Sequence, residues 1–202
     1  MLAFLSSLAS KSIAIGLAIT AGVLVVVNNR RLLLLALLAQ YLLVGLLMAR
    51  LISPQVALVE VAIGFLVCLI LFLTIHQLSG RGGSPEQTVE ASPTPLRSAF
   101  LSLAVILVGL AVPSLAGRYP LPEVSLEICL ACYWLCSMGF LAASLTERPL
   151  KAGSGLLTFL LGFELFYITL ESSLSVLALL GAIDCLVGLL IAYLALAHGE
   201  ET

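Results

Sequence analysis

Charged residues are scarce in this chain of 202 residues. Only 10% of the side chains belong to Asp, Glu, Lys or Arg, whereas about 25% is usual in a soluble domain. The mean hydropathy is +1.20, and 61% of the residues are hydrophobic. This composition excludes an ordinary soluble globular protein. A net charge of −2, without a basic patch that contains aromatic residues, gives no sign of a nucleic-acid partner.

Groups typical of enzyme active sites are equally scarce. The chain has two histidines, His76 and His198, and both fall at predicted helix ends. No set of Ser and His, of His and Glu, or of Cys and His suggests catalysis or metal binding. The five cysteines lie in apolar segments, where Cys behaves as a small hydrophobic residue. Three of them share one helix face but lack further ligands nearby: Cys129, Cys132 and Cys136. We expect no cofactor, no metal and no catalysis by the chain alone.

Long apolar runs dominate the sequence. About 20 apolar residues are needed for a helix to cross roughly 30 Å of hydrocarbon. The runs therefore predict an all-α fold, a polytopic transmembrane helical bundle of about seven spans. The first run could be a signal peptide, but its length, its internal Lys11 and the lack of a clear cleavage site favour a span. The expected spans are Phe4–Val27, Arg31–Leu51, Ser53–His76, Ser98–Gly117, Glu123–Leu145, Gly153–Leu170 and Leu174–Ala197.

Basic residues are distributed unevenly between the two sides of these spans. The connections after the first, third and fifth spans contain Arg30, Arg31, Arg81, Arg97, Arg148 and Lys151. The other side contains Lys11, Arg50 and Arg118. Because cytoplasmic loops carry an excess of Lys and Arg, we expect an external N-terminus and a cytoplasmic C-terminus. A multi-pass protein of the plasma membrane is expected.

One segment differs from the rest in composition. Residues 79–95 are rich in Gly, Ser and Pro, which predicts a flexible cytoplasmic linker over 79–97. The linker would separate a three-span half, 1–78, from a four-span half, 98–202. No other loop is long enough to form a domain that binds a nucleotide, a flavin or a large soluble substrate.

Acidic side chains inside the apolar runs are the most informative feature. Glu164 and Asp184 lie near the middle of their spans, and Glu60 lies in the outer half of its span. A carboxylate at the centre of a spanning helix costs about 2.5–3.5 kcal/mol. Glu171 is seven residues after Glu164, on nearly the same helix face, and Glu127 is near an outer end. Such acids are functional by default, most often in ion pathways.

We therefore interpret Glu164, Asp184, Glu60 and Glu171 as proton-relay residues. The alternative for a single buried acid is a neutral, hydrogen-bonded packing residue. For Glu127 and Glu171 a hydrated helix end is the simpler explanation. Four other polar residues more often serve packing or interfaces: Gln40, Gln55, Tyr41 and Tyr167. Of these, Gln40, Gln55 and Tyr167 are possible path-lining residues.

The C-terminal half resembles a known family. TERPLKAGSGLLTFLLGFELFYITLES, residues 146–172, is a basic turn followed by a helix with a central G-x-E, and it resembles the second helix of the K-type subunit of complex I. LLGAIDCLVGLLIAYLALA, residues 179–197, resembles the third helix of that subunit, with Asp184 where the family carries an acid. The resemblance covers about residues 123–197. Glu164 and Glu171 are both candidates for the acid of the second helix.

The N-terminal half is similar to a small domain of Mrp-type antiporters and membrane-bound hydrogenases. The pattern P-x-V-A-x-x-E-x-x-x-G is met by Pro54, Val56, Ala57, Glu60 and Gly64. The whole plan resembles component E of hydrogenase-4-type and formate hydrogenlyase complexes.

These resemblances imply a non-catalytic subunit that binds no cofactor. It would relay protons or sodium ions between a redox module and antiporter-like subunits. Its partners would be membrane lipid and the antiporter-like and other small membrane subunits of a larger complex. Two alternatives remain open at this point. One is a stand-alone secondary transporter or channel, and the other is a structural or assembly subunit.

Overall fold

A computed structural model describes residues 2–27, 29–52, 54–80, 95–120, 124–146, 148–170 and 173–200 of the chain. Within these ranges the backbone is helical, without a strand. The expected all-α fold is therefore confirmed. The helices are α1 (Leu2–Val26), α2 (Arg30–Met48), α3 (Pro54–Gly80), α4 (Pro95–Arg118), α5 (Leu126–Ser144), α6 (Pro149–Leu170) and α7 (Leu174–Glu200).

Six of these helices, α2 to α7, are long and apolar enough to cross a membrane. The part of α1 with described side chains, from Ser12 to Val26, is a shorter apolar helix. Large apolar side chains also dominate the exposed faces, with Leu110 on α4 70% exposed and Leu58 on α3 67% exposed. In water such a surface would be unfavourable. The chain is a multi-pass membrane protein whose outer surface contacts lipid. Which end faces the cytoplasm stays a prediction.

Some helix ends differ from the predicted spans. α6 begins at Pro149 rather than Gly153, because proline suits the first turn of a helix, where its missing N–H needs no partner. α3 continues to Gly80 and α4 begins at Pro95, so helices occupy both edges of the predicted linker 79–97. Residues 81–94 of that linker lie outside the described residues. α5 begins at Leu126 instead of Glu123.

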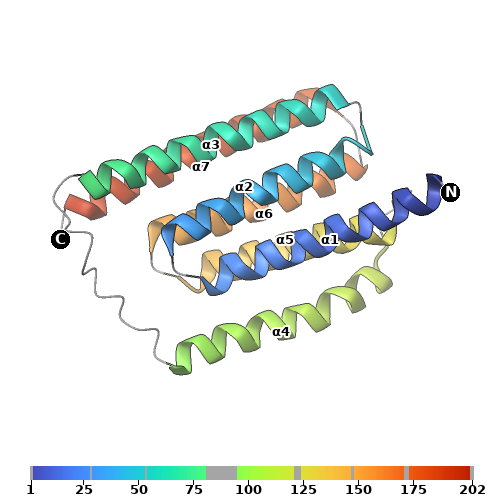
Figure 1. Ribbon diagram of the computed structural model, residues 1–202, viewed down its shortest axis with the longest axis horizontal. Coiled ribbons are helices and arrows are strands. Elements are labelled where there is room, and N and C mark those ends of the chain that lie inside the picture. The colour runs from blue at the N-terminus through green and yellow to red at the C-terminus, as the bar shows by residue number, and fades with distance from the viewer. Residues whose placement is uncertain are drawn as a thin grey trace.

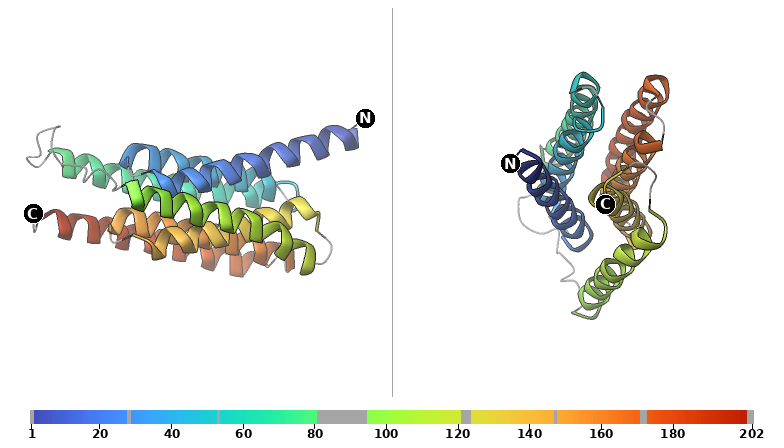
Figure 2. Two further views of the ribbon diagram at one scale, coloured as in Figure 1. Left: turned by 90° about the horizontal axis from the view of Figure 1, so that it is seen from below. Right: turned by 90° about the vertical axis from the view of Figure 1, so that its right-hand side faces the viewer.

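The helices form two facing rows with one helix at the edge (Figures 1 and 2). Figure 1 looks onto the row of α1, α2 and α3, behind which α5, α6 and α7 lie. α1 packs on α5, α2 on α6 and α3 on α7. In the end-on view of Figure 2 the two rows lie side by side and α4, in green, lies at the lower edge. α4 contacts α5 and α1. The two predicted halves of the chain thus share one helical bundle.

The two ends of the bundle carry different turns. The α1–α2 and α5–α6 turns, with Arg30, Arg31 and Arg148, lie together at one end, which we name the basic end. The α2–α3 and α4–α5 connections, with Arg50 and Arg118, lie at the opposite end. In Figure 1 the basic end is on the left, where α7 also ends.

The buried positions of α7 explain how an acid comes to face the interior. Leu177, Gly181, Asp184, Gly188 and Ile191 are all buried and follow one another at alternating spacings of four and three residues. Residues at this spacing share one face of a helix. Asp184 therefore lies in the middle of the stripe that packs against the neighbouring helices. α3 has a similar buried stripe, and it contains Glu60.

Glycines allow α5 and α6 to approach closely. A Cβ atom added to Gly162 would lie 2.8 Å from the backbone N of Cys136, and one added to Gly155 would lie 2.6 Å from the backbone N of Ala143. Small residues at such contacts are typical of membrane helix pairs. This contact places α6, and with it Glu164, within the bundle.

Candidate functional site

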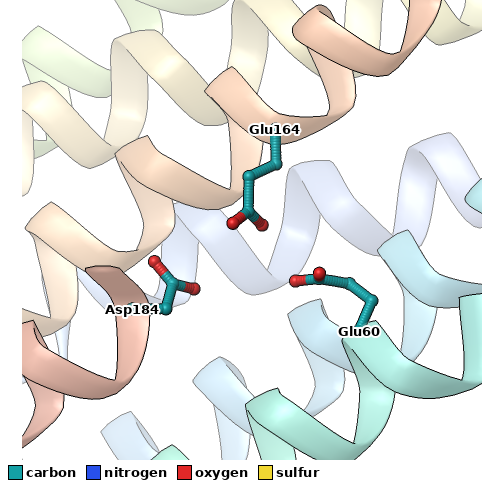
Figure 3. Close-up of side chains that lie close together, drawn as sticks. All are labelled: Glu60, Glu164 and Asp184. Carbon is teal, nitrogen blue, oxygen red and sulfur yellow. The ribbon is translucent and has the colours of Figure 1, made fainter. Parts of the chain in front are cut away.

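Three buried carboxyl groups from three helices meet inside the bundle (Figure 3). Glu60 comes from α3, Glu164 from α6 and Asp184 from α7, and their carboxyl groups point toward one another. One carboxyl oxygen of each lies within 4.8 Å of the others. All three side chains are 0% exposed. We name this group the acid triad. It is assembled from both rows of the bundle, because Glu60 belongs to the row of α1–α3 and the other two to the row of α5–α7.

Tyr41 of α2 is the hydrogen-bond partner of the triad. Its hydroxyl group donates to Oδ2 of Asp184 at 2.5 Å, and the whole side chain is 0% exposed. Gly64 of α3 makes room for the ring, because a Cβ atom at Gly64 would overlap Cβ, Cγ and Cδ1 of Tyr41. The tyrosine thereby joins α2 to α7 across the bundle.

Apart from the triad carboxyl groups themselves, no side chain or backbone group in the described part of the chain donates a hydrogen bond to the other triad oxygens. This holds for both oxygens of Glu60, both oxygens of Glu164 and Oδ1 of Asp184. Buried carboxylates are normally compensated by paired cations or several donors. Here the nearest compensating groups are the other acids themselves, so a proton or a bound cation must reduce the negative charge.

A second polar pair lies nearer the basic end. Thr158 of α6 donates its hydroxyl hydrogen to Oε1 of Gln40 of α2, with an oxygen–oxygen distance of 2.8 Å. Both side chains are 0% exposed. The amide nitrogen Nε2 of Gln40 is buried and has no described acceptor.

The donor set of the triad consists of oxygen atoms alone. Oxygen ligands suit protons and hard cations, and they do not suit the soft metals that Cys and His bind. Among the described residues, the triad is the one group of three or more His, Cys, Asp or Glu side chains close enough to share an ion. All five cysteines are free thiols, and Cys129, Cys132 and Cys136 do not form such a group.

The structure brings together three of the four predicted relay residues: Glu60, Glu164 and Asp184 form the triad. Glu171 lies outside the described residues. Of the possible path-lining residues, only Gln40 is fully buried. Gln55 is exposed at the start of α3, and Tyr167 is half-buried on α6. Gln55 is therefore not in a position to line an interior path.

Tyr41 and Thr158 are the polar residues that sequence reasoning missed. The sequence favours a packing or interface role for Tyr41, although Gln40 and Tyr41 are the only polar side chains between Arg31 and Arg50. A second signal was the spacing of the polar residues. Gln40 and Glu60 are twenty residues apart, as are Glu164 and Asp184. This repeated spacing indicates that both helix pairs carry polar groups at comparable depths, but it does not say which helices are neighbours.

Replacing Tyr41 by Phe tests the role of its hydroxyl group. The Tyr41→Phe variant leaves Oδ2 of Asp184 buried without its donor, which costs about 1–3 kcal/mol. We expect the free energy of unfolding, measured by sodium dodecyl sulfate titration in mixed micelles, to fall by that amount. Tyr193→Phe is the matched control, because Tyr193 is 70% exposed on α7. If both variants have the same free energy of unfolding as the parent protein, this role of the hydroxyl group is refuted.

Compared with models of protein families, with curated proteins and with solved structures, the chain shows no match.

Proposed function

We propose that the chain is a non-catalytic membrane subunit of a proton- or sodium-translocating complex in the plasma membrane, and that the acid triad relays the ion. The observation that carries this proposal is the convergence of Glu60, Glu164 and Asp184 in the interior of a membrane protein. Ionisable groups inside a membrane are expensive and typically mark ion pathways.

Mutual repulsion makes the triad a charge-sensing element. Two unit charges 4.8 Å apart repel each other by roughly 3–4 kcal/mol at an effective dielectric constant near 20. The three groups therefore do not carry three negative charges at once without a bound cation. When an ion leaves one carboxyl group, the affinity of the other two for an ion rises. Ion transfer at one helix is thus coupled to the other two helices.

Tyr41 extends this coupling to a fourth helix. Its hydroxyl group donates to Asp184, and this hydrogen bond is stronger when Asp184 is charged. Loss or gain of charge at Asp184 therefore changes how firmly α2 and α7 are held together. A change in protonation can in this way bias the packing of the bundle.

The role as a subunit rests on the resemblances of the chain. The described residues belong almost entirely to apolar helices, as expected for a membrane subunit of this kind. The resemblance to K-type and Mrp-type proteins favours antiporter-like and other small membrane subunits as partners. The redox reaction or ion gradient that drives transport would come from those partners.

Gentle extraction of the tagged chain from its own membrane tests this role. We expect native mass spectrometry to find the chain bound to larger antiporter-like membrane subunits, because its resemblance to K-type and Mrp-type proteins implies such partners. An unrelated membrane protein of similar size that carries the same tag is the control. Recovery of the chain alone or only as a homo-oligomer would favour a stand-alone transporter. The chain could also be recovered in the expected complex while neutralising the triad acids leaves ion translocation unchanged. That result would favour a structural subunit.

A further inference from the structure

Apart from Tyr41, which binds the triad itself, the buried polar side chains that the structure describes outside the triad lie on one side of it. Between the triad and the basic end, the described part of the bundle contains five of them: Gln40, Thr74, Lys151, Ser154 and Thr158. Between the triad and the opposite end, the described buried side chains of α2, α3, α6 and α7 are apolar: Val44, Leu47, Met48, Ala57, Leu165, Ile168, Leu177 and Leu180. We name the second set the apolar plug. The surroundings of the triad are therefore asymmetric.

Three of the polar residues form a line along α6. Lys151, Ser154 and Thr158 are separated by three and four residues, so they lie on one face of the helix. All three are buried, with Lys151 7% and the other two 0% exposed. At 1.5 Å of rise per residue, the line from Lys151 to Thr158 measures about 10 Å. Glu164 lies six residues further along α6 and about 120° around it, so the line approaches the triad through Gln40 and Tyr41 of α2. It begins in the first turn of α6, at the basic end.

Gln40 joins this line from the facing helix. Oε1 of Gln40 accepts the Thr158 hydrogen bond at 2.8 Å. The same hydroxyl group has a second acceptor, the backbone oxygen of Ser154 at 2.9 Å. Thr158 can thus turn its hydrogen from one acceptor to the other, and its oxygen is then able to accept a hydrogen bond in return. Tyr41, the next residue after Gln40, is bound to Asp184.

The buried amide group of Gln40 indicates that water is present in this region. Its Nε2 atom is buried and has no described acceptor, and buried amide donors are almost always satisfied by protein or by ordered water. Hydroxyl and amide groups that both donate and accept hydrogen bonds can hold such water molecules in place. The side chains of the apolar plug offer water no such partners.

We propose that Lys151, Ser154, Thr158 and Gln40 line a hydrated path through which the acid triad exchanges ions with the basic end of the bundle, while the apolar plug closes the opposite end. This proposal adds an access route to the proposed function. Its statement that ions use the path rests on that function. The presence of water in the path is a separate property, and it is tested without measuring transport.

Silver ions in chloride-free buffer are the probe for this path. Ag⁺ is similar in size to a hydronium ion. It reacts with a thiol to form a silver thiolate, and the thiol proton is released. Single-cysteine variants of the full chain, Ser154→Cys and Thr158→Cys, are made after replacing the five native cysteines. Both substitutions nearly preserve side-chain size. Ag⁺ is added to either face of sealed membrane vesicles. Unreacted thiol is then counted by alkylation after denaturation.

Three reference thiols define the sides and the background. Asn29→Cys reports the basic end and Leu51→Cys the opposite end, because both residues are exposed in turns. A chain that keeps only native Cys132 reports an apolar interior position, since Cys132 is 1% exposed. Ala57→Cys reports the apolar plug, where Ala57 is 4% exposed.

We expect Ser154→Cys and Thr158→Cys to react with Ag⁺ from the same face as Asn29→Cys. They should react roughly tenfold or more faster than Cys132, because thiols in apolar surroundings stay protonated and inert. Ala57→Cys should react as slowly as Cys132. Reaction from the face that Leu51→Cys reports, or at the slow rate of Cys132, would overturn the proposed path. Either result is independent of whether neutralising Glu164 stops ion transport, so failure of the path and failure of the proposed function can be told apart.

Discussion

The Glu164→Gln variant is expected to assemble normally and to lose ion translocation. Gln keeps the size and hydrogen-bonding capacity of the side chain but cannot bind and release a proton. It also removes the repulsion of Glu164 with Glu60 and with Asp184, which amounts to roughly 3–4 kcal/mol for each pair and corresponds to more than a hundredfold in the affinity of the neighbouring acid for an ion. We expect the rate of ion translocation by the complex, measured in sealed vesicles with a pH-sensitive dye, to fall at least tenfold, which corresponds to about 1.4 kcal/mol.

Two further variants separate the charge of Glu164 from its packing. Glu164→Asp keeps a carboxyl group and should recover part of the rate. Glu127→Gln makes the same chemical change in the first turn of α5, where the side chain is half-buried, and should leave the rate unchanged. If Glu164→Gln translocates ions at the parent rate in an intact complex, the triad does not relay ions and a structural role is the better explanation.

The largest effect on stability is expected from Gly139→Ala. A Cβ atom at Gly139 of α5 would overlap the backbone N and Cα of Phe159 and lie 2.8 Å from the backbone oxygen of Gly155. Backbone atoms cannot rotate away as a side chain can, so α5 and α6 would have to separate. Overpacking of this kind typically costs about 1–3 kcal/mol or more. We expect the midpoint of unfolding in dodecyl sulfate to fall accordingly, together with the amount of folded protein in the membrane.

Gly117→Ala and Gly22→Ala are the matched controls for this change. A Cβ atom at either glycine would meet nothing within 4 Å. Because Ala favours a helix over Gly by about 0.5–1 kcal/mol, both controls should be neutral or slightly stabilising. An unchanged midpoint for Gly139→Ala would show that α5 and α6 can separate without loss of stability, against the close packing described above.

Part of the candidate site was accessible from the sequence because of its chemistry. Glu60, Glu164 and Asp184 stand out in apolar runs, and inserting a carboxylate there is costly enough to require a reason. Their inward orientation was not accessible in this way, because the buried stripes of α3 and α7 that contain Glu60 and Asp184 are known only from the structure. Tyr41 and Thr158 were not identified, because tyrosine and threonine are inserted into apolar helices at little cost and so give no comparable signal. Their role depends on which helix lies opposite.

By itself the amino-acid sequence determined the class of this protein: an all-α, multi-pass membrane bundle. The physical reason is local, since the length and hydrophobicity of each run meet the requirement of the bilayer without reference to other runs. Only the tertiary structure decided that Glu60 joins Glu164, more than a hundred residues away, and that Tyr41 binds Asp184. Helix pairing in a membrane depends on the fit of small residues and side-chain shapes between helices. The periodicity of a single helix does not contain that information.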